Sequence, residues 1–378
     1  MSGILFLAAG LLLVVHLASV ALYLYRLARP MVAPSRIGHP FVTLLRPVCG
    51  LTHAERETLR SSFTQDYPDY EVIFCAETET DPAVPFLRQL MAEYPAIRAR
   101  LLIGQDRVTR NPKLNNVWKG WHGAEADWIC MTDSNLLLPP DYLARVVAQW
   151  GPTTGCVSAP PVGMAPQGWA ARLECAFLNG NQARMQYAAD SIGPAYAQGK
   201  TLFFHKPLLE GAGGLRALGR DLAEDVAATR LVRGLGLQVS LARLPFAQPI
   251  GRRRLSDVWA RQLRWARVRR AGFPVLYALE PLNGAVLPVL FVMGGLAGAG
   301  APMTWAIGYL ALWYLAEGWL MRRAGWPSRT GDLWLLPLRD LLLPALWLAS
   351  FRRRGFDWHG KPMGEADDAA RPVMVPAE

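Results

Sequence analysis

The fold is decided by residues 71–103, which read EVIFCAETETDPAVPFLRQLMAEYPAIRARLLI. An apolar, β-rich run at Glu71–Ala76 is followed by a helical pattern at Val84–Tyr94 and by a second β-rich run at Arg100–Ile103. Strands that alternate with helices indicate βαβ units and a mostly parallel sheet. The stretch therefore predicts an α/β domain, and ligands of such domains bind at the carboxyl ends of the strands.

The same alternation extends on both sides of this stretch. Phe41–Leu45 and Trp128–Met131 are further predicted strands, and Glu55–Phe63 is a further predicted helix. Together they indicate one soluble domain over residues 38–270. Acidic residues follow two of the strand ends and are the first candidates for a site: Glu77, Glu79 and Asp81 after one strand, and Asp133 after another.

An apolar segment precedes this domain, and hydrophobic residues make up 52% of the chain. Residues 1–27 predict a transmembrane helix, because the apolar run Gly3–Tyr25 would span about 34 Å as a helix. Arginines follow this segment and none precedes it, which places the domain on the cytosolic side. A cleaved signal peptide would instead have a basic start and a shorter apolar core.

Two more apolar segments follow the domain, so we expect a multi-pass integral membrane protein. Residues 281–321 predict a transmembrane hairpin, since Gly298–Pro302 divides the run into two helices. Residues 331–351 carry Arg339 and Asp340 in their middle, where each charge would cost about 2.5–3.5 kcal/mol at the bilayer centre. We therefore expect a re-entrant or interfacial helix there.

Charge and cysteine content narrow the classes of function. The formal charge of +10 fits anionic lipid or a phosphorylated substrate, and the apolar segments favour these partners over nucleic acid. The five cysteines are scattered and form no CxxC pair, which argues against a disulfide framework and against a zinc site. The polar, Pro/Ala-rich residues 362–378 predict a disordered tail.

Two acidic motifs have the chemistry of sugar transfer. Asp133, in Met131–Asn135, is a strand-end carboxylate that could hold the divalent cation of a sugar diphosphate. The alternative is an aspartate that starts a turn. Asp225, in Leu222–Val226, could deprotonate an acceptor hydroxyl. The alternative is that it and Glu224 are two acids at a helix N-terminus.

Two basic motifs could meet a phosphate. Residues 252–270 contain eight Arg and one Asp, and Arg261 and Arg264 share one face of a predicted helix. Arg binds phosphate bidentately, and the alternative is a basic amphipathic helix that rests on anionic lipid. Lys113, in Asn111–Asn116, is a second candidate, and its alternative is a turn followed by a helix cap.

Ten short motifs occur along the soluble domain in a fixed order. They are Leu45–Gly50, Gln65–Val72, Asp81–Ala83, Arg100–Gly104, Asn111–Asn116, Thr132–Ser134, Gln167–Ala171, Ala212–Leu215, Ala223–Asp225 and Arg261–Trp265. In this order they resemble the ceramide glucosyltransferases, a family of inverting, single-transfer enzymes with the glycosyltransferase-A (GT-A) fold. The arrangement of one span, a soluble domain and a membrane hairpin is similar to this family as well. Hopanoid glycosyltransferases share the motif order.

The resemblance implies a role for each matched residue. Asp133 matches the aspartate near the donor diphosphate and its metal, Mg²⁺ or Mn²⁺. Asp225 matches the catalytic base. Arg261, Arg264 and Trp265 match the (Q/R)xxRW motif that engages the donor diphosphate and closes the site.

This sequence departs from the family pattern at two places. Thr78 stands where the family has its first aspartate, so that Glu77 or Glu79 would have to supply the uracil and ribose contacts, beside Asp81. Ser158 stands in place of a histidine associated with donor binding in animal members. The second departure leaves the donor sugar open between glucose, galactose and N-acetylglucosamine.

The resemblance implies transfer of one sugar, glucose before galactose, from a UDP-sugar to the primary hydroxyl of ceramide with inversion. The motifs leave open transfer of a hexose or N-acetylglucosamine to a hopanoid or to diacylglycerol. A processive polysaccharide synthase would need more membrane segments than those after Arg270. The non-enzymatic alternative is a membrane-anchored module that binds anionic lipid.

Overall fold

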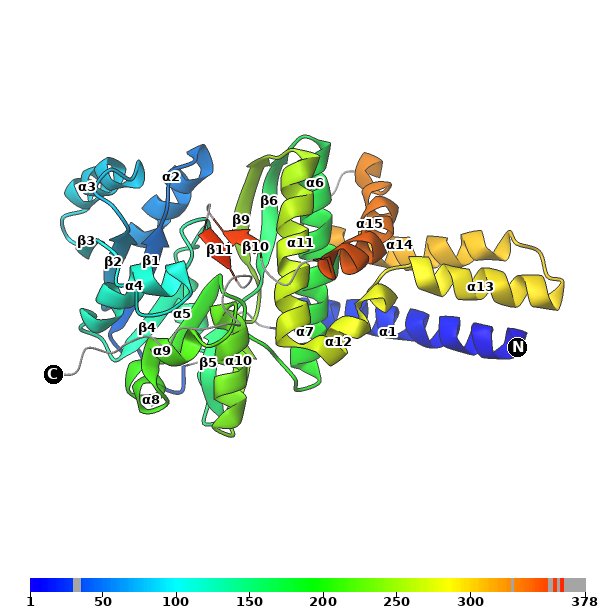
Figure 1. Ribbon diagram of the computed structural model, residues 1–378, viewed down its shortest axis with the longest axis horizontal. Coiled ribbons are helices and arrows are strands. Elements are labelled where there is room, and N and C mark those ends of the chain that lie inside the picture. Colours follow the sequence, from blue (N-terminus) through cyan, green and yellow to red (C-terminus); the bar gives the residue numbers. More distant parts are fainter. Residues whose placement is uncertain (30–34, 328–329, 353–355, 359–360, 364–378) are drawn as a thin grey trace.

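The computed structural model describes residues 1–29, 35–327, 330–352, 356–358 and 361–363. A seven-stranded sheet forms one end of the molecule, and three long helices project from the other (Figure 1). The strand order is β3-β2-β1-β4-β7-β5-β8. The bounds are β1 (Val42–Val48), β2 (Tyr70–Ala76), β3 (Arg98–Ile103), β4 (Trp128–Thr132), β5 (Thr154–Ser158), β7 (Thr201–His205) and β8 (Gln238–Leu241).

The prediction of a mostly parallel sheet is confirmed. Strands β3, β2, β1 and β4 pair in parallel, as do β5 and β8. Strand β7 is the exception, because it runs antiparallel between β4 and β5. Its register sets Thr201 opposite Thr132, which brings the residue before β7 next to the carboxyl end of β4.

Helices cover both faces of the sheet. Leu44 and Leu45 follow one another on β1, point to opposite faces and are both fully buried. Burial of each such side chain contributes about 1.5–3 kcal/mol. One face lies against α2 (His53–Arg60), α3 (Ala83–Glu93) and α5 (Tyr142–Val147). The other lies against α4 (Pro112–His122) and α10 (Glu224–Gly234).

A second layer connects the sheet to the projecting helices. Strands β6 (Pro161–Gln167) and β9 (Phe246–Arg252) form a parallel pair. They lead into two helical rods that lie side by side in Figure 1. The first rod is α6 (Trp169–Cys175), the π-helix η2 (Ala176–Ala183) and α7 (Arg184–Ser191), and the second is α11 (Leu255–Gly272). Short helices α8 (Lys206–Gly211) and α9 (Gly214–Leu218) follow β7.

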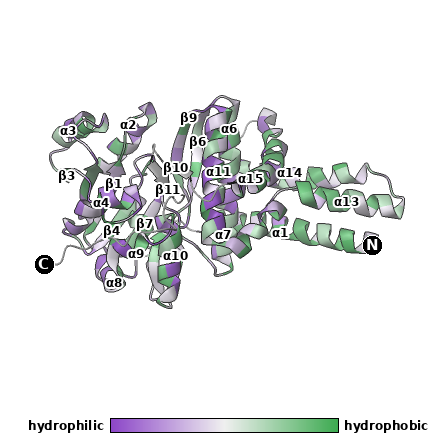
Figure 2. Ribbon diagram, viewed as in Figure 1, coloured by the Kyte–Doolittle hydropathy of each residue, from purple (hydrophilic) through white to green (hydrophobic). Residues whose placement is uncertain are grey.

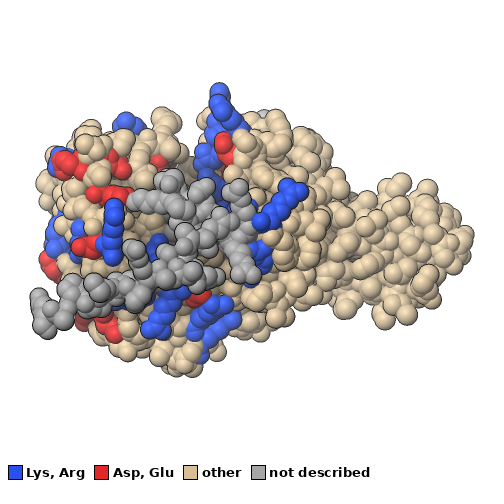
Figure 3. Space-filling view, in the orientation of Figure 1, with Lys and Arg blue, Asp and Glu red and all other residues tan. Residues whose placement is uncertain are grey.

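The projecting helices are α1 (Ser2–Ala28), α13 (Val286–Ala299) and α14 (Trp305–Arg323). Their outer ends are hydrophobic (Figure 2), and the space-filling view shows no charged side chain there on the face drawn (Figure 3). Among the described residues, α1 is the helix that is long and apolar enough to cross a membrane. Helix α13 has 14 residues, a rise of about 21 Å, so the hairpin at 281–321 stays a prediction.

Helix α15 (Leu335–Ser350) packs against α11 and α6. Its two charges, Arg339 and Asp340, are fully buried and bonded to one another at 2.7 Å. Arg339 also binds both carboxylate oxygens of Glu317 on α14, the longer contact measuring 3.0 Å. Protein groups therefore neutralise these charges, while the re-entrant or interfacial placement of 331–351 stays a prediction.

The end of the described chain is a short hairpin of β10 (Phe356–Trp358) and β11 (Lys361–Met363). The first two residues of the tail predicted at 362–378 are thus part of β11. The remainder of that tail, 364–378, lies outside the described residues.

Candidate active site

The site is centred on Asp133, directly after β4. Its Oδ1 lies 2.6 Å from Lys113 Nζ and its Oδ2 lies 2.8 Å from Lys200 Nζ. Burial alone would raise the pKa of Asp133, but the two ammonium groups hold it well below its usual range. Asp133 therefore carries a full negative charge, which is balanced by the buried Lys113 and the partly buried Lys200.

The loop that carries Asp133 is fixed from beneath by a buried arginine. Arg46, on β1, is fully buried and donates to the carbonyl oxygens of Asp133 at 2.8 Å, Ser134 at 3.1 Å and Leu136 at 2.9 Å. It also donates to Thr58 O on α2 at 2.8 Å. A single side chain thus satisfies four carbonyl groups and sets the position of the loop.

Lys113 belongs to the site and also to a helix start. Asn111 caps α4 and accepts from Lys113 N at 2.9 Å, so the cap alternative is correct for the backbone. The Lys113 side chain is buried and binds Asp133, Glu224 Oε1 at 2.7 Å and Gly199 O at 2.7 Å. Burial would lower the pKa of Lys113, but its two carboxylate neighbours raise it above the ordinary value, so it stays charged.

Asp225 lies beside this network at the start of α10. Its Oδ2 accepts from Gly199 N at 3.0 Å and its Oδ1 from Val226 N at 2.8 Å. Burial, and then the charge of Glu224, raise the pKa of Asp225 to about 6. Such a carboxylate is ionised at neutral pH and accepts a proton more readily than an ordinary aspartate, as a general base must.

Helix α11 supplies the second wall. Arg261 pairs with the fully buried Glu174 at 2.7 Å, and burial lowers the pKa of both Arg261 and Arg264. The charge of Asp133 opposes the effect of burial on the pKa of Arg264, and the charge of Arg261 adds to the effect of burial on the pKa of Lys200. The arginines of α11 are therefore close enough to Asp133 and Lys200 for their charges to interact. Trp265 packs against the apolar cluster around Cys175, which anchors the helix.

The three acids after β2 make other contacts. Glu79 pairs with Arg88 at 2.5 Å, and both side chains are more than half exposed. Asp81 accepts from Gly50 N at 2.9 Å and from Ala83 N at 2.8 Å, which ties the end of β1 to the start of α3. Burial lowers the pKa of Lys119 on α4, and the charge of Glu77 is one of those that oppose this shift. Their assignment to the donor nucleotide stays a prediction.

Two site residues were missed by sequence reasoning. Lys200 precedes β7, a strand that the alternation did not predict, and it reaches Asp133 through the antiparallel register of β7 with β4. Glu174 is a lone acid in the apolar run Leu173–Leu178, and this pattern could have marked it as the buried partner of a basic group.

The oxygen atoms of the site fit a divalent cation that is held partly by the protein and partly by a substrate phosphate. Asp133 Oδ2 and Asn135 Oδ1 both lie 2.8 Å from Lys200 Nζ, so two oxygens converge on one positive group. Magnesium is often held by one or two carboxylates together with substrate phosphates. No group of three or more His, Cys, Asp or Glu with metal-binding spacing occurs in the described part of the chain.

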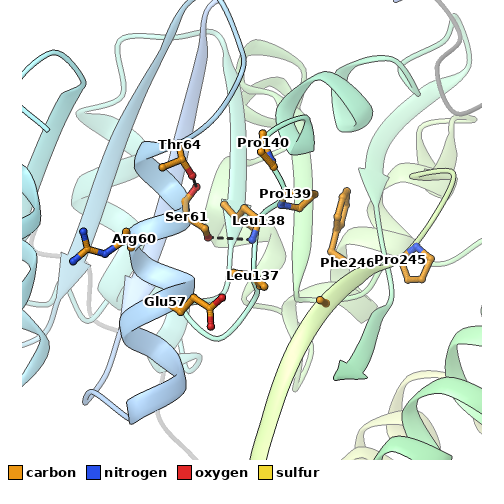
Figure 4. A pocket seen from close by; sticks show the side chains of 11 residues that line it. Glu57, Arg60, Ser61, Thr64, Leu137, Leu138, Pro139, Pro140, Pro245 and Phe246 are labelled. Atoms are coloured by element: carbon orange, nitrogen blue, oxygen red, sulfur yellow. Dashed lines mark hydrogen bonds between the residues drawn. The ribbon is translucent and has the colours of Figure 1, made fainter. Parts of the chain in front are cut away.

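One cavity lies outside this site. It has a volume of about 480 Å³ and lies between α2 and the segment Leu137–Pro140 (Figure 4). Its polar contact is Leu138 N donating to Ser61 Oγ at 3.1 Å, and neither Asp133 nor Asp225 lines it.

Known proteins are similar to this chain in sequence. The family model described as glycosyl transferase family 21 matches residues 11–367. Ceramide glucosyltransferase 1 of Caenorhabditis elegans is 26% identical over 288 residues, which are 76% of this chain and 61% of the relative. Ceramide glucosyltransferase of Komagataella phaffii is 38% identical over 110 residues, 28% of this chain and 22% of the relative. The chain thus matches about 60% of the nematode relative's length.

One solved structure supports the fold. The mannosyltransferase PcManGT of Pyrobaculum calidifontis, in complex with GDP-Man and Mn²⁺, superposes with a TM-score of 0.54 at 20% identity. The match covers 93% of this chain and 98% of that one. It confirms the predicted GT-A fold.

Proposed function

Because the chain belongs to glycosyl transferase family 21, we propose that it transfers one hexose from a UDP-sugar to a primary hydroxyl of a membrane lipid. The observation that carries the proposal is the pairing of Lys113 and Lys200 with Asp133, beside the carboxylate of Asp225, whose pKa is raised to about 6. The preferred pair is UDP-glucose with ceramide, in line with the named relatives.

The donor diphosphate would lie between Asp133 and α11. Lys200, Arg261 and Arg264 have pKa values lowered by burial and by neighbouring positive groups, so an anion placed among them would relieve an unfavourable charge. Arg side chains also match phosphate oxygens in geometry. These cations would stabilise the charge that develops on the departing UDP.

Asp225 would act on the acceptor. The lipid hydroxyl oxygen attacks the anomeric carbon, its proton passes to the Asp225 carboxylate, and the bond from that carbon to the phosphate oxygen breaks. The new glycosidic bond forms on the face opposite the departing UDP, so the anomeric configuration inverts. Gly199 N holds the Asp225 Oδ2 in place at 3.0 Å.

A divalent cation, Mg²⁺ or Mn²⁺, would be held by Asp133 with Asn135 and by the donor phosphates. When bound, it would supply further positive charge to the leaving group. The mannosyltransferase of the same fold is in complex with Mn²⁺. With the cation bound, Lys200 Nζ would leave Asp133 and pair with the donor phosphates instead.

We place the catalytic domain at the cytosolic face of a membrane, with α1 as a span and α13 and α14 inserted beside it. The apolar outer ends of these helices (Figure 2) and the arginines after α1 support this placement. The basic face of α11 would then lie near the membrane surface, where the acceptor hydroxyl is presented.

A product assay tests the proposal. Membranes that contain the protein receive UDP-glucose, UDP-galactose or UDP-N-acetylglucosamine, each with ceramide, a hopanoid polyol or diacylglycerol, and mass spectrometry measures the lipids. We expect one added hexose on ceramide, lost in Asp225→Asn and retained in Asp69→Asn, whose side chain is exposed. No product with any pair, together with binding to anionic vesicles, would refute the enzyme and favour the lipid-binding module.

A further inference from the structure

Residues Gln198–Thr201 form a turn directly before β7. Thr201 N donates to Gln198 O at 3.2 Å, which closes the turn. The second residue of the turn is a glycine for a steric reason, because a Cβ on Gly199 would lie 2.7 Å from Glu224 Oε1. No larger residue fits there unless Glu224 moves. The backbone of the turn therefore packs directly against the start of α10.

Both sides of the candidate active site are bonded to this turn. On the side of the base, Gly199 N donates to Asp225 Oδ2 at 3.0 Å. On the donor side, Gly199 O accepts from Lys113 Nζ at 2.7 Å. The side chain of Lys200 lies 2.8 Å from Asp133, and the carbonyl oxygen of Lys200 accepts from Asp133 N at 3.3 Å. The position of the turn therefore sets the position of the base relative to the groups that would bind the donor.

Two buried hydroxyl groups bind the backbone at the start of the turn. Ser158, at the end of β5, is fully buried, and its Oγ accepts from Gln198 N at 2.8 Å and donates to Gln198 O at 3.2 Å. Thr229, on α10, is also fully buried, and its Oγ1 accepts from Ala197 N at 2.9 Å and donates to Asp225 O at 2.8 Å. Each hydroxyl group therefore both donates to the backbone and accepts from it.

Three successive backbone N–H groups, those of residues 197–199, are bound by side chains. Their acceptors are Thr229, Ser158 and Asp225 in turn. About two-thirds of the hydrogen bonds in proteins join backbone to backbone, so a run of three such side-chain contacts is an uncommon way to fix a loop. A displacement of about 1 Å at the reacting groups can lower a rate about a hundredfold. The two hydroxyl groups can therefore affect the reaction without contact with a substrate.

We propose that Ser158 and Thr229 are positioning residues of the reaction, which act through the turn to align the Asp225 carboxylate with the bound donor. The inference rests on the proposed function. Ser158 acts through the backbone of Gln198, so it contributes to the catalytic geometry and not to the choice of donor sugar.

Removal of either hydroxyl group tests the inference. Ser158→Ala and Thr229→Val each remove the bonds to the turn, and we expect kcat for hexose transfer to fall about tenfold while the KM for the UDP-sugar changes less than about threefold. Thr229→Ser keeps the hydroxyl group and should behave as the wild type. Thr43→Val is the matched control, because Thr43 is equally buried and its Oγ1 donates to Glu71 at 2.6 Å, outside the site.

The pKa of Asp225 reports on the turn. The hydrogen bond from Gly199 N is one of the contacts that lower it. Among the described residues, Glu224, Lys113 and Tyr196 also interact with this carboxylate. Glu224 and Lys113 stay paired with one another, and Tyr196, whose pKa burial raises to about 12, stays neutral at the pH of the assay. A looser turn should therefore raise the pKa of Asp225, so the acid limb of the pH–rate profile should move to higher pH in both variants and stay in place in the control.

Hydrogen exchange separates this inference from the proposed function. Mass spectrometry measures the exchange of the peptide that contains residues 197–200, in the full chain and without substrate. Faster exchange in Ser158→Ala and Thr229→Val than in Thr43→Val, with the lower kcat and the shifted acid limb, supports the inference. Exchange or kcat equal to the control in both variants, or a changed preference among UDP-sugars in Ser158→Ala, would overturn it and leave the proposed function intact. A wild-type protein that transfers no hexose would refute the proposed function, whatever the exchange.

Discussion

The acid limb of the pH–rate profile should be set by Asp225, and Glu224→Gln should move it. Burial and then Glu224 raise the pKa of Asp225 from its ordinary value of 3.8 to about 6. Glu224 is the second of the two causes that raise this pKa, and Gly199 N, Lys113 and Val226 N lower it, so loss of the Glu224 charge should lower the pKa of Asp225. Loss of the Glu224 charge also removes one of the two carboxylates that neutralise Lys113. The positive charge of Lys113 would then lower the pKa of Asp225 further.

The sign of the effect follows from the role of a base. A base works only when it is ionised, so kcat/KM for the lipid should fall about tenfold for each pH unit below 6 in the wild type. In Glu224→Gln the midpoint of this fall should lie at a lower pH than in the wild type, whatever the absolute rate.

The assay is the initial rate of hexose transfer to lipid between about pH 4.5 and 8, at subsaturating lipid. Glu125→Gln is the matched control, because its side chain is 60% exposed, and its midpoint should equal that of the wild type. A midpoint in Glu224→Gln that stays at the wild-type value, or rises, would refute the assignment of Asp225 as the base.

Three further changes test the rest of the site and its support. Lys200→Met should raise the KM for the UDP-sugar about ten- to a hundredfold, because one charged hydrogen bond contributes about 1.5–3 kcal/mol; an unchanged donor titration would remove Lys200 from the donor site. Arg46→Lys should destabilise the fold by about 2–4 kcal/mol, since the single ammonium group of lysine cannot bind all the carbonyl groups of the Asp133 loop, and urea denaturation measures this. Removal of divalent cations with EDTA should stop transfer and added Mn²⁺ or Mg²⁺ should restore it, whereas full activity in EDTA would exclude the cation.

Much of the fold follows from the sequence because its signals are local. The β-rich runs and the helical pattern between them predicted strands β1 to β4 and helix α3 to within two or three residues. The period of a strand or helix depends on neighbouring residues alone. The strand-end rule also made Asp133 a candidate site residue, since the carboxyl end of a buried strand can be predicted from the sequence.

The composition of the site needed long-range structure. Lys200 reaches Asp133 because β7 inserts antiparallel beside β4, and no local pattern states which strands pair. Glu174 meets Arg261 only because two helical rods lie side by side. For Lys113 the sequence left two interpretations open, a site residue and a helix cap, and the structure shows features of both. Asn111 caps α4, and the side chain of Lys113, two residues later, binds Asp133.

The sequence by itself determined the alternating α/β plan, the apolar flanks, and the acid and arginine motifs, because periodicity, hydropathy and charge are properties of short stretches. Only the tertiary structure decided how these charges are matched. Lys113 lies between Asp133 and Glu224, and Arg339 lies between Asp340 and Glu317, from parts of the chain far apart in sequence. A charge can be buried only where the fold brings it a partner, and that depends on strand register and helix packing.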